Sequence, residues 1–188
     1  MFAYLYFLAG HKIHLLNTHL ESLTKNSEER VKQFKVCLNR CIQFSEDDTV
    51  IFGGDLGLHN HEVESTRGLK DVWEFCGSRP DLKYTWDMLK NKNINLTSCK
   101  PHSKPQFRFD RIYIRLSHER DIVPSDFRLV GQEKIPGTGL YPSDHWGIIA
   151  KFCLPNVENA VAVAVSNLTK KPRKQLKALK ISGESEGC

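Results

Sequence analysis

The sequence predicts an α/β or α+β domain in which helices cover the faces of a β-sheet. Three observations support this prediction: the segments typical of strands outnumber the helical ones, one of these segments is apolar throughout, and another alternates polar and apolar residues. An apolar strand is buried on both faces, whereas an alternating strand is buried on one. A mixture of both kinds is typical of a layered domain of sheets and helices.

Length and charge suggest one domain followed by a tail. With 188 residues, 40% of them hydrophobic, the chain can bury a substantial core. The net charge is +5, but residues 170–180 alone hold six basic residues and no acid, so the rest of the chain is only slightly basic. We therefore expect a domain over residues 1–154 and a basic, flexible tail over residues 155–188 that adds salt-sensitive affinity for DNA.

The cysteines and the lengths of the apolar runs give information about the cellular compartment of the protein. The six cysteines include no Cys-x-x-Cys pair and no histidine set at zinc spacing, which predicts reduced thiols. Cys37 and Cys41 are expected as small core residues on one face of a helix. No run is long enough to cross a membrane, and residues 1–9 are too short for a signal peptide.

The first two predicted strands form a hairpin, and a helix follows. Residues 2–8 and 12–18 are rich in β-forming residues and are separated by Ala9-Gly10-His11. Asn26, with Glu29 three residues later, predicts the start of a helix through a capping box. Apolar residues then recur at helical spacing for about four turns: Val31, Phe34, Cys37, Leu38, Cys41 and Ile42.

The middle of the chain predicts one buried strand and several short elements. Residues 49–52 are wholly apolar and are followed by Gly53-Gly54-Asp55, the pattern of a buried strand that ends at a functional edge. Residues 59–67 predict a short helix. Residues 71–75 and 84–87 predict the ends of elements rather than long ones.

The last part predicts three more strands. A polar loop over residues 88–106 precedes an alternating strand over residues 107–115. Residues 125–130 predict a weaker strand, and residues 146–154 predict the strand that closes the core.

Acidic and imidazole side chains follow several of these predicted strands. His19 comes after the second strand, Asp55 after the buried strand, and Asp110 lies within the alternating one. Asp144 and His145 follow a Gly/Pro-rich approach, in a loop before the last strand. At one sheet edge, a carboxylate could align a water while imidazoles stabilise negative charge on a phosphodiester, and such sites normally add a divalent metal.

Each of these residues also has a structural interpretation. His19 could cap a turn, Asp55 could be a turn residue or a helix cap, and the Ser143-Asp144-His145 segment could be a surface loop. Asp110 is harder to explain in this way, because aspartate is disfavoured within strands and a buried carboxylate needs a partner. We predict a hydrogen bond between Asp110 and His145.

Six short segments, taken together and in this order, resemble the endonuclease/exonuclease/phosphatase family over residues 1–154. The aspartates and the Ser143-Asp144-His145 segment are shared by the whole family, which includes deoxyribonuclease I, inositol phosphatases and deadenylases. Thr85-Trp86-Asp87 and Trp73-Glu74-Phe75 point to its tyrosyl-DNA branch. The segments are residues 17–22 (NTHLES), 53–55 (GGD), 71–75 (DVWEF), 84–87 (YTWD), 109–112 (FDRI) and 142–147 (PSDHWG).

The resemblance implies a fold, a reaction and a compartment. The fold would be a four-layer α-β-β-α sandwich like that of deoxyribonuclease I, of which this chain would hold the C-terminal portion, truncated at the N-terminus. The reaction would be magnesium-dependent hydrolysis, with manganese as a possible substitute. Its substrate would be the 5′-phosphotyrosyl bond between a trapped topoisomerase and a single-stranded 5′ end of DNA. The protein would act in DNA repair, in the nucleus and cytoplasm.

The resemblance also implies a role for each site residue. Asp55 would align the attacking water, His145 would stabilise the transition state, Asp110 would orient the His145 ring, Asp144 would stand near the metal and His19 would contact phosphate. Trp86 and Phe109 would flank the 5′ end of the DNA as stacking platforms. The residues that bind the DNA substrate would be His19, Glu21, Ser22, Gly57, His59, Trp86 and Phe109.

Two departures from the family pattern weaken the expected activity. Gly57 and His59 stand where the family has an Asn and an Arg, and the segment with the family's metal-binding Glu is absent. Magnesium would then be poorly bound, with Asp144 as a weak ligand, and the chain alone would be inactive. The alternative is a catalytically inactive partial homologue or a DNA- or protein-binding fragment. A deadenylase or a lipid phosphatase also stays open.

Overall fold

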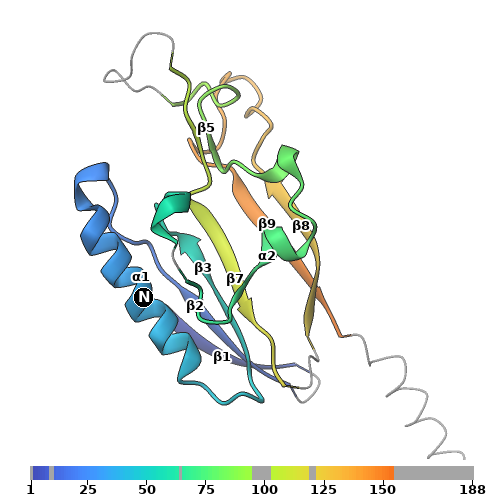
Figure 1. The fold of residues 1–188 in the computed structure, drawn as a ribbon. Helices are drawn as coiled ribbons and strands as arrows, with labels where there is room; N and C mark the ends of the chain where they lie inside the picture. The colour runs from blue at the N-terminus through green and yellow to red at the C-terminus, as the bar shows by residue number, and fades with distance from the viewer. Residues whose placement is uncertain (1, 9–10, 64, 95–102, 119–121, 155–188) are drawn as a thin grey trace, which may run out of the picture. The chain divides into compact units, whose positions relative to one another are not determined.

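The computed structural model describes residues 2–8, 11–63, 65–94, 103–118 and 122–154. They all belong to the first of two units, Met1–Leu154, and the tail predicted over residues 155–188 lies outside them. The main feature is a five-stranded sheet with the order β1-β2-β3-β7-β4 (Figure 1). Its strands are β1 (Phe2–Leu8), β2 (His11–Asn17), β3 (Thr49–Asp55), β7 (Asp110–Arg115) and β4 (Lys70–Asp71).

Strand pairing brings distant parts of the chain together. β1 and β2 form the predicted antiparallel hairpin, and β2 pairs with β3 in parallel. β7 runs antiparallel to both β3 and β4. Two smaller sheets complete the β-structure: β8 (Val123–Val130) with β9 (Gly147–Cys153), and the two-residue strands β5 (Trp86–Asp87) and β6 (Gln106–Phe107).

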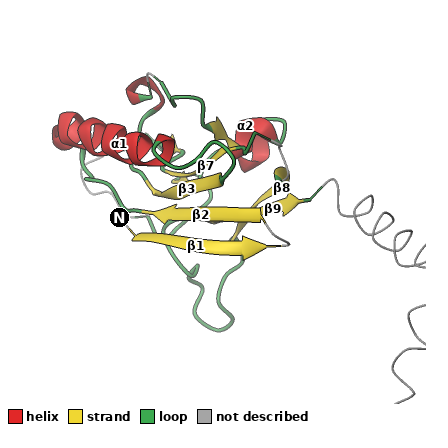
Figure 2. Cartoon of the chain, turned by 90° about the horizontal axis from the view of Figure 1, so that it is seen from below, coloured by secondary structure: helices red, strands yellow, loops and turns green. Residues whose placement is uncertain are grey.

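The five-stranded sheet is covered on two faces. Helix α1 (Ser27–Ile42) packs on one face through Phe34, Leu38 and Cys41, against Phe52 and Tyr113 of the sheet. The β8–β9 sheet packs on the other face (Figure 2), where its apolar residues meet β3 and β7. The second core includes Ile51, Ile112, Ile114, Phe127, Leu129, Ile148, Ala150 and Phe152.

Helix α1 follows the predicted periodicity, but its start differs from the predicted cap. Asn26 occupies the N-cap position without a side-chain cap hydrogen bond, and its Nδ2 instead donates to Glu21 Oε1 over 3.0 Å. The predicted capping box is therefore wrong. The acidic Glu28 and Glu29 still favour this end of the helix dipole. Beyond the other end of the helix, Arg115 donates to four backbone carbonyls, those of Cys41, Phe44, Ser45 and Asp48.

Two glycines allow the strands to approach closely where β3 ends. Gly54 has φ of +139°, and a Cβ there would lie 1.9 Å from the carbonyl oxygen of Thr18. A Cβ at Gly53 would lie 2.7 Å from the carbonyl oxygen of Arg111. The absence of side chains at Gly53 and Gly54 thus allows the neighbouring backbone to pack closely, directly before Asp55.

Two predictions about elements are wrong. The helix predicted over residues 59–67 is only a 3₁₀ turn, Asn60–Glu62, because the chain leaves helical geometry at Val63, whose φ and ψ are −93° and 81°. The strand predicted over residues 107–115 is divided between β6 and β7, because Arg108 turns inward and donates to Asp71 over 2.6 Å.

The remaining elements agree with the sequence. Residues 71–75 form the end of β4 and the short helix α2 (Val72–Phe75), and residues 80–82 form a 3₁₀ turn. Cys37 and Cys41 are buried free thiols, as predicted. In the described part of the chain, no helix has the length and apolar character needed to cross a membrane.

Candidate active site

The site is built where β3 and β7 lie side by side. Asp55 pairs directly with Asp110 across these two strands, so both carboxylates emerge on the sheet face that also carries the β8–β9 sheet. His145, in the loop before β9, has its Nδ1 2.8 Å from Asp110 Oδ2. The predicted hydrogen bond between Asp110 and His145 is therefore confirmed.

Two imidazoles approach the same oxygen of Asp55. His19 Nε2 lies 3.4 Å from Asp55 Oδ2, and His145 Nε2 lies 4.0 Å from it. The other oxygen, Oδ1, accepts the backbone N–H of Gly57 over 3.1 Å. Of the four residues predicted to converge at one edge, His19, Asp55 and His145 are brought together by these contacts, and no such contact joins Asp144 to them. Asp144, next to His145, is exposed, and its Oδ1 lies 3.4 Å from Ser143 Oγ.

The surroundings of the site raise the pKa values of Asp55 and His145. Burial, and then the nearby Asp110 carboxylate, raise the pKa of Asp55, while His145 and His19 act against this shift. The hydrogen bond with Asp110 raises the pKa of His145 above its ordinary value. The charged form of His145 is thus favoured beside the carboxylate of Asp55.

The same residues form a donor set for a metal ion. Asp55, Asp110 and His145 each offer one ligand atom, and these atoms lie within 4.8 Å of one another. Two carboxylate oxygens suit a hard divalent cation, which would also relieve the repulsion that raises the pKa of Asp55. The residues present therefore fit a divalent metal, although the Asp144 ligand predicted from the sequence is outside this set.

Aromatic side chains lie beside the edge that carries Asp55 and Asp110. Phe109 stacks on Phe107 with ring centroids 4.9 Å apart, and its ring lies 6.0 Å from that of Trp86 and 6.3 Å from that of His145. His59 meets Phe109 edge to face. Trp86 is buried, whereas Phe109 is half-buried. Of the two predicted stacking residues, Phe109 is the one that offers more ring surface.

The other predicted substrate residues lie in the loops around Asp55. The Glu21 carboxylate accepts the backbone N–H of Ser22 and the amide of Asn26, so it holds its own loop. Gly57 has φ of +57°, and a Cβ there would lie 3.3 Å from Arg30 Cδ. This left-handed conformation accepts Gly and, among other residues, favours Asn.

The sequence did not reveal the residues that hold the Asp144-His145 loop. Asn91 Nδ2 donates to Ser143 O over 2.9 Å, and Asn93 Nδ2 donates to Tyr141 O over 2.8 Å. Thr85 Oγ1 accepts the Asp110 N–H over 3.1 Å. Only the place of Asn91 and Asn93 in a polar, Asn-rich stretch could have suggested their role.

Comparisons with known proteins agree with this geometry. Tyrosyl-DNA phosphodiesterase 2 of Gallus gallus is 40% identical over 150 residues, which are 77% of this chain and 39% of the relative. The Danio rerio tyrosyl-DNA phosphodiesterase 2 complexed with single-stranded DNA product is 36% identical, with a TM-score of 0.73. That match covers 80% of this chain and 60% of the solved chain. No protein-family model matches the sequence.

A more distant structure supports the fold alone. An endonuclease/exonuclease/phosphatase family protein of Bacteroides thetaiotaomicron is 16% identical with a TM-score of 0.50, over 77% of this chain and 51% of its own. The predicted fold class is therefore confirmed, and the described residues supply α1 and both packed sheets of that sandwich. The chain spans about two fifths of the length of the relatives that it matches. By sequence and by structure, this chain is similar to part of tyrosyl-DNA phosphodiesterase 2, and it shares the fold of an endonuclease/exonuclease/phosphatase family protein.

Proposed function

We propose that this edge hydrolyses the 5′-phosphotyrosyl bond between a trapped topoisomerase and DNA, assisted by a divalent metal. The observation that supports this most directly is the approach of His19 and His145 to Asp55 Oδ2, with Asp110 hydrogen-bonded to the other ring nitrogen of His145. The names of the relatives point to the same bond. The DNA product in the zebrafish structure supports a single-stranded DNA substrate.

The geometry suggests how the side chains divide the reaction. Asp55 Oδ2 aligns a water for attack on the phosphorus, since this oxygen faces the open edge between two imidazoles. His145, whose pKa is raised by its hydrogen bond with Asp110, stabilises in its charged form the negative charge that develops on the phosphoryl oxygens. His19 holds the phosphate from the other side. Asp55 and Asp110, the two carboxylates of this donor set, would hold magnesium or manganese, which would supply further charge stabilisation when bound.

The proposal also includes the contacts with the DNA strand and the cellular compartment. The half-buried ring of Phe109, backed by Trp86, would stack on the base at the 5′ end. Glu21, Ser22, Gly57 and His59 would line the substrate side, and Asp144 would make an outer contact to the metal. We also propose that the protein acts in the nucleus and cytoplasm.

Turnover of a 5′-phosphotyrosyl oligonucleotide by the purified chain in magnesium tests this proposal. Asp55 and Asp110 place two carboxylates within reach of one cation, so we expect slow turnover. Asp55→Asn and His145→Ala should each lower the rate at least about a hundredfold. The exposed Asp47→Asn and His118→Ala are matched controls and should leave the rate unchanged.

Two results would contradict the proposal. Turnover that survives in Asp55→Asn would place the reaction elsewhere. Binding of the oligonucleotide without any turnover, in the presence of magnesium or manganese, would support the inactive DNA-binding alternative.

A further inference from the structure

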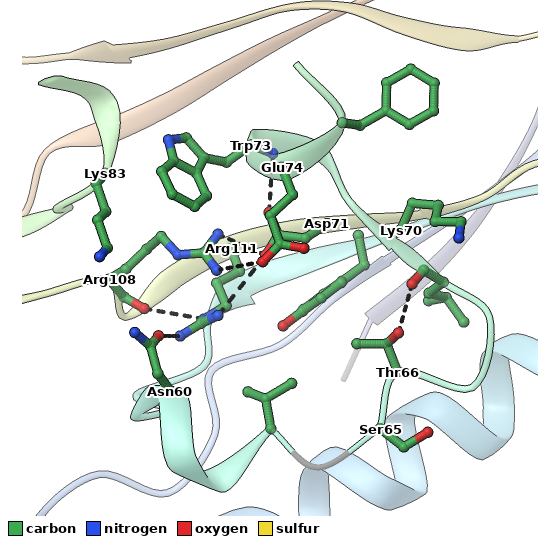
Figure 3. Close-up of a pocket in the computed structure, with 14 residues that line it drawn as sticks. Asn60, Ser65, Thr66, Lys70, Asp71, Trp73, Glu74, Lys83, Arg108 and Arg111 are labelled. Atoms are coloured by element: carbon green, nitrogen blue, oxygen red, sulfur yellow. Dashed lines mark hydrogen bonds and ion pairs between the residues drawn. The ribbon is translucent and has the colours of Figure 1, made fainter. Parts of the chain in front are cut away.

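A second pocket, of about 890 Å³, lies between the 3₁₀ turn at Asn60, strand β4 and helix α2 (Figure 3). Three charged side chains form its buried part: Asp71, Arg108 and Arg111, which we call the Arg108–Arg111 pocket. In Figure 3 the two guanidinium groups lie beside Asp71, and Lys83 extends from the wall of the pocket. The proposed reaction uses none of these residues.

The buried charges of this pocket do not balance. Arg108 Nη1 donates to Asp71 Oδ2 over 2.6 Å, and Arg111 Nη1 lies 3.9 Å from the same oxygen. The side chains of Asp71, Arg108 and Arg111 are 4%, 6% and 3% exposed. Glu74 lies 3.8 Å from Arg108 Nη2, but its side chain is 62% exposed to water. One buried carboxylate thus faces two buried guanidinium groups.

The hydrogen bonds of Arg111 do not supply the missing negative charge. Its guanidinium donates to the carbonyl oxygens of Arg108 and Leu58 and to Asn60 Oδ1, all of them neutral. Burial lowers the pKa of Arg111, as expected for a cation whose desolvation is only partly compensated. Arg108 Nε is also buried, without a hydrogen-bond partner among the described residues.

A buried pair elsewhere in the chain shows what a balanced arrangement looks like. Arg30 is 1% exposed and donates to Glu62, which is 3% exposed, through both Nε and Nη2. That pair has one cation for one anion. The Arg108–Arg111 pocket has one cation in excess, opens to solvent, and is lined by two lysines, Lys70 and Lys83.

We propose that the Arg108–Arg111 pocket binds a phosphate group. The planar, forked donors of arginine match phosphate oxygens in geometry, and a phosphate supplies the negative charge that the buried side chains lack. The pocket volume leaves room for a larger molecule that bears this phosphate, such as a nucleotide. The phosphate could be free or part of a nucleic-acid backbone. This proposal is independent of the proposed phosphodiesterase function.

Nuclear magnetic resonance of the arginine Nε–H groups in the full chain tests the proposal. Inorganic phosphate is titrated in at constant ionic strength, with chloride as the reference anion. We expect saturable shifts of the Arg108 and Arg111 signals. Lys83→Glu, which leaves the buried ion pairs intact, should weaken phosphate binding about tenfold or more. Lys151→Glu makes the same charge change at an exposed position on β9 and should have no effect.

A second titration separates the two sources of phosphate. A single-stranded oligonucleotide without a 5′ adduct that produces the same two shifts, and competes with phosphate, would identify a nucleic-acid backbone as the ligand. Shifts with inorganic phosphate alone would identify a small phosphorylated molecule. Absence of saturable shifts with either ligand, or equal phosphate affinity in Lys83→Glu and the unchanged chain, would overturn the proposal. Neither titration measures turnover, so a negative result would overturn the phosphate-binding proposal without bearing on the catalytic one.

Discussion

At the scale of single residues, Asp110 sets the charge of His145. The hydrogen bond between Asp110 and His145 raises the pKa of the imidazole. A group whose pKa is raised by folding stabilises the protein fully below its unfolded pKa, about 6.5, and this stabilisation is lost as the pH rises through the folded pKa. The imidazolium needed at the transition state is therefore available at a higher pH than in a free histidine.

The first prediction follows from this bond. Asp110→Asn should lower the pKa of His145, measured by nuclear magnetic resonance titration of the ring. The loss of unfolding free energy in Asp110→Asn should be larger at mildly acidic pH than at alkaline pH, where the imidazole is neutral in both proteins. An unchanged His145 titration would show that another group controls its charge.

The second prediction concerns Gly57, where the family has an Asn. The φ of +57° is a conformation that Asn adopts more readily than most residues, and a Cβ there meets the flexible Arg30 stem at 3.3 Å. Gly57→Asn should therefore fold and add a polar contact to the substrate, raising the turnover rate about tenfold or more.

Gly57→Ala is the matched control for this substitution. It adds the same Cβ without the amide, so it should bring no gain in rate, and the left-handed backbone should cost about 1 kcal/mol of stability. Equal gains in both variants would contradict a polar role for the Asn.

At the scale of elements, a buried ion pair joins helix α1 to the turn after β3. Arg30 on α1 holds Glu62 through two hydrogen bonds, and Ser27 donates a third. Burial acts to raise the pKa of Glu62, but the hydrogen bonds from Arg30, Ser27 and the His59 backbone outweigh it and lower the pKa to about 2. A lowered pKa stabilises the fold above the unfolded value of the glutamate, and this contribution is lost as the pH falls toward 2.

The third prediction is that Glu62→Gln destabilises the fold by about 3–5 kcal/mol at neutral pH, because it leaves Arg30 buried without its counter-ion. Urea unfolding measures the loss, which should shrink in acid as Glu62 of the unchanged chain becomes protonated. Asp81→Asn removes the carboxylate of an exposed pair with Arg79 and should leave the urea midpoint unchanged. A similar, small effect of both substitutions would contradict a structural role for the buried pair.

The elements also show where sequence patterns suffice. Helix α1 and strand β3 follow from residue spacing, because each buries a regular set of side chains. The helix predicted over residues 59–67 ends at Glu62, whose side chain bonds to Arg30, 32 positions earlier. The break between β6 and β7 depends on Asp71, 37 positions before Arg108. Such pairings between distant residues leave no local pattern in the sequence.

At the scale of the whole molecule, the candidate site depends on the sheet topology. His19, Asp55 and Asp110 could be predicted as a group because each follows or lies in a strand, and the strands β2, β3 and β7 are neighbours. The supports Asn91 and Asn93 could not, since they belong to a polar loop without periodicity. The charge imbalance of the Arg108–Arg111 pocket could not be predicted from the sequence either, because the residues that line the pocket come from separate elements.

The last prediction concerns the basic stretch over residues 170–180, which is a property of the sequence rather than of the described fold. Each basic residue that neutralises a DNA phosphate releases counterions, so the logarithm of affinity falls with the logarithm of salt concentration by about 0.7 per contact on single strands. A chain that ends at Leu154 lacks all six of these charges. Its binding to single-stranded DNA should therefore be weaker at low salt, with a slope smaller by up to about 4.

The full-length chain with those six residues replaced by glutamine is the matched control for this truncation. It keeps the length of the tail and removes its charge, so it should behave like the chain that ends at Leu154. The expected pattern is a difference in DNA affinity that disappears at high salt and does not depend on the base sequence, because phosphate contacts do not read bases. Equal affinity of the full and truncated chains across the salt range would show that the basic stretch does not contact DNA. If the full chain still bound DNA more tightly than the truncated chain at high salt, or if the glutamine variant bound more tightly than the truncated chain, the tail would make contacts other than charge.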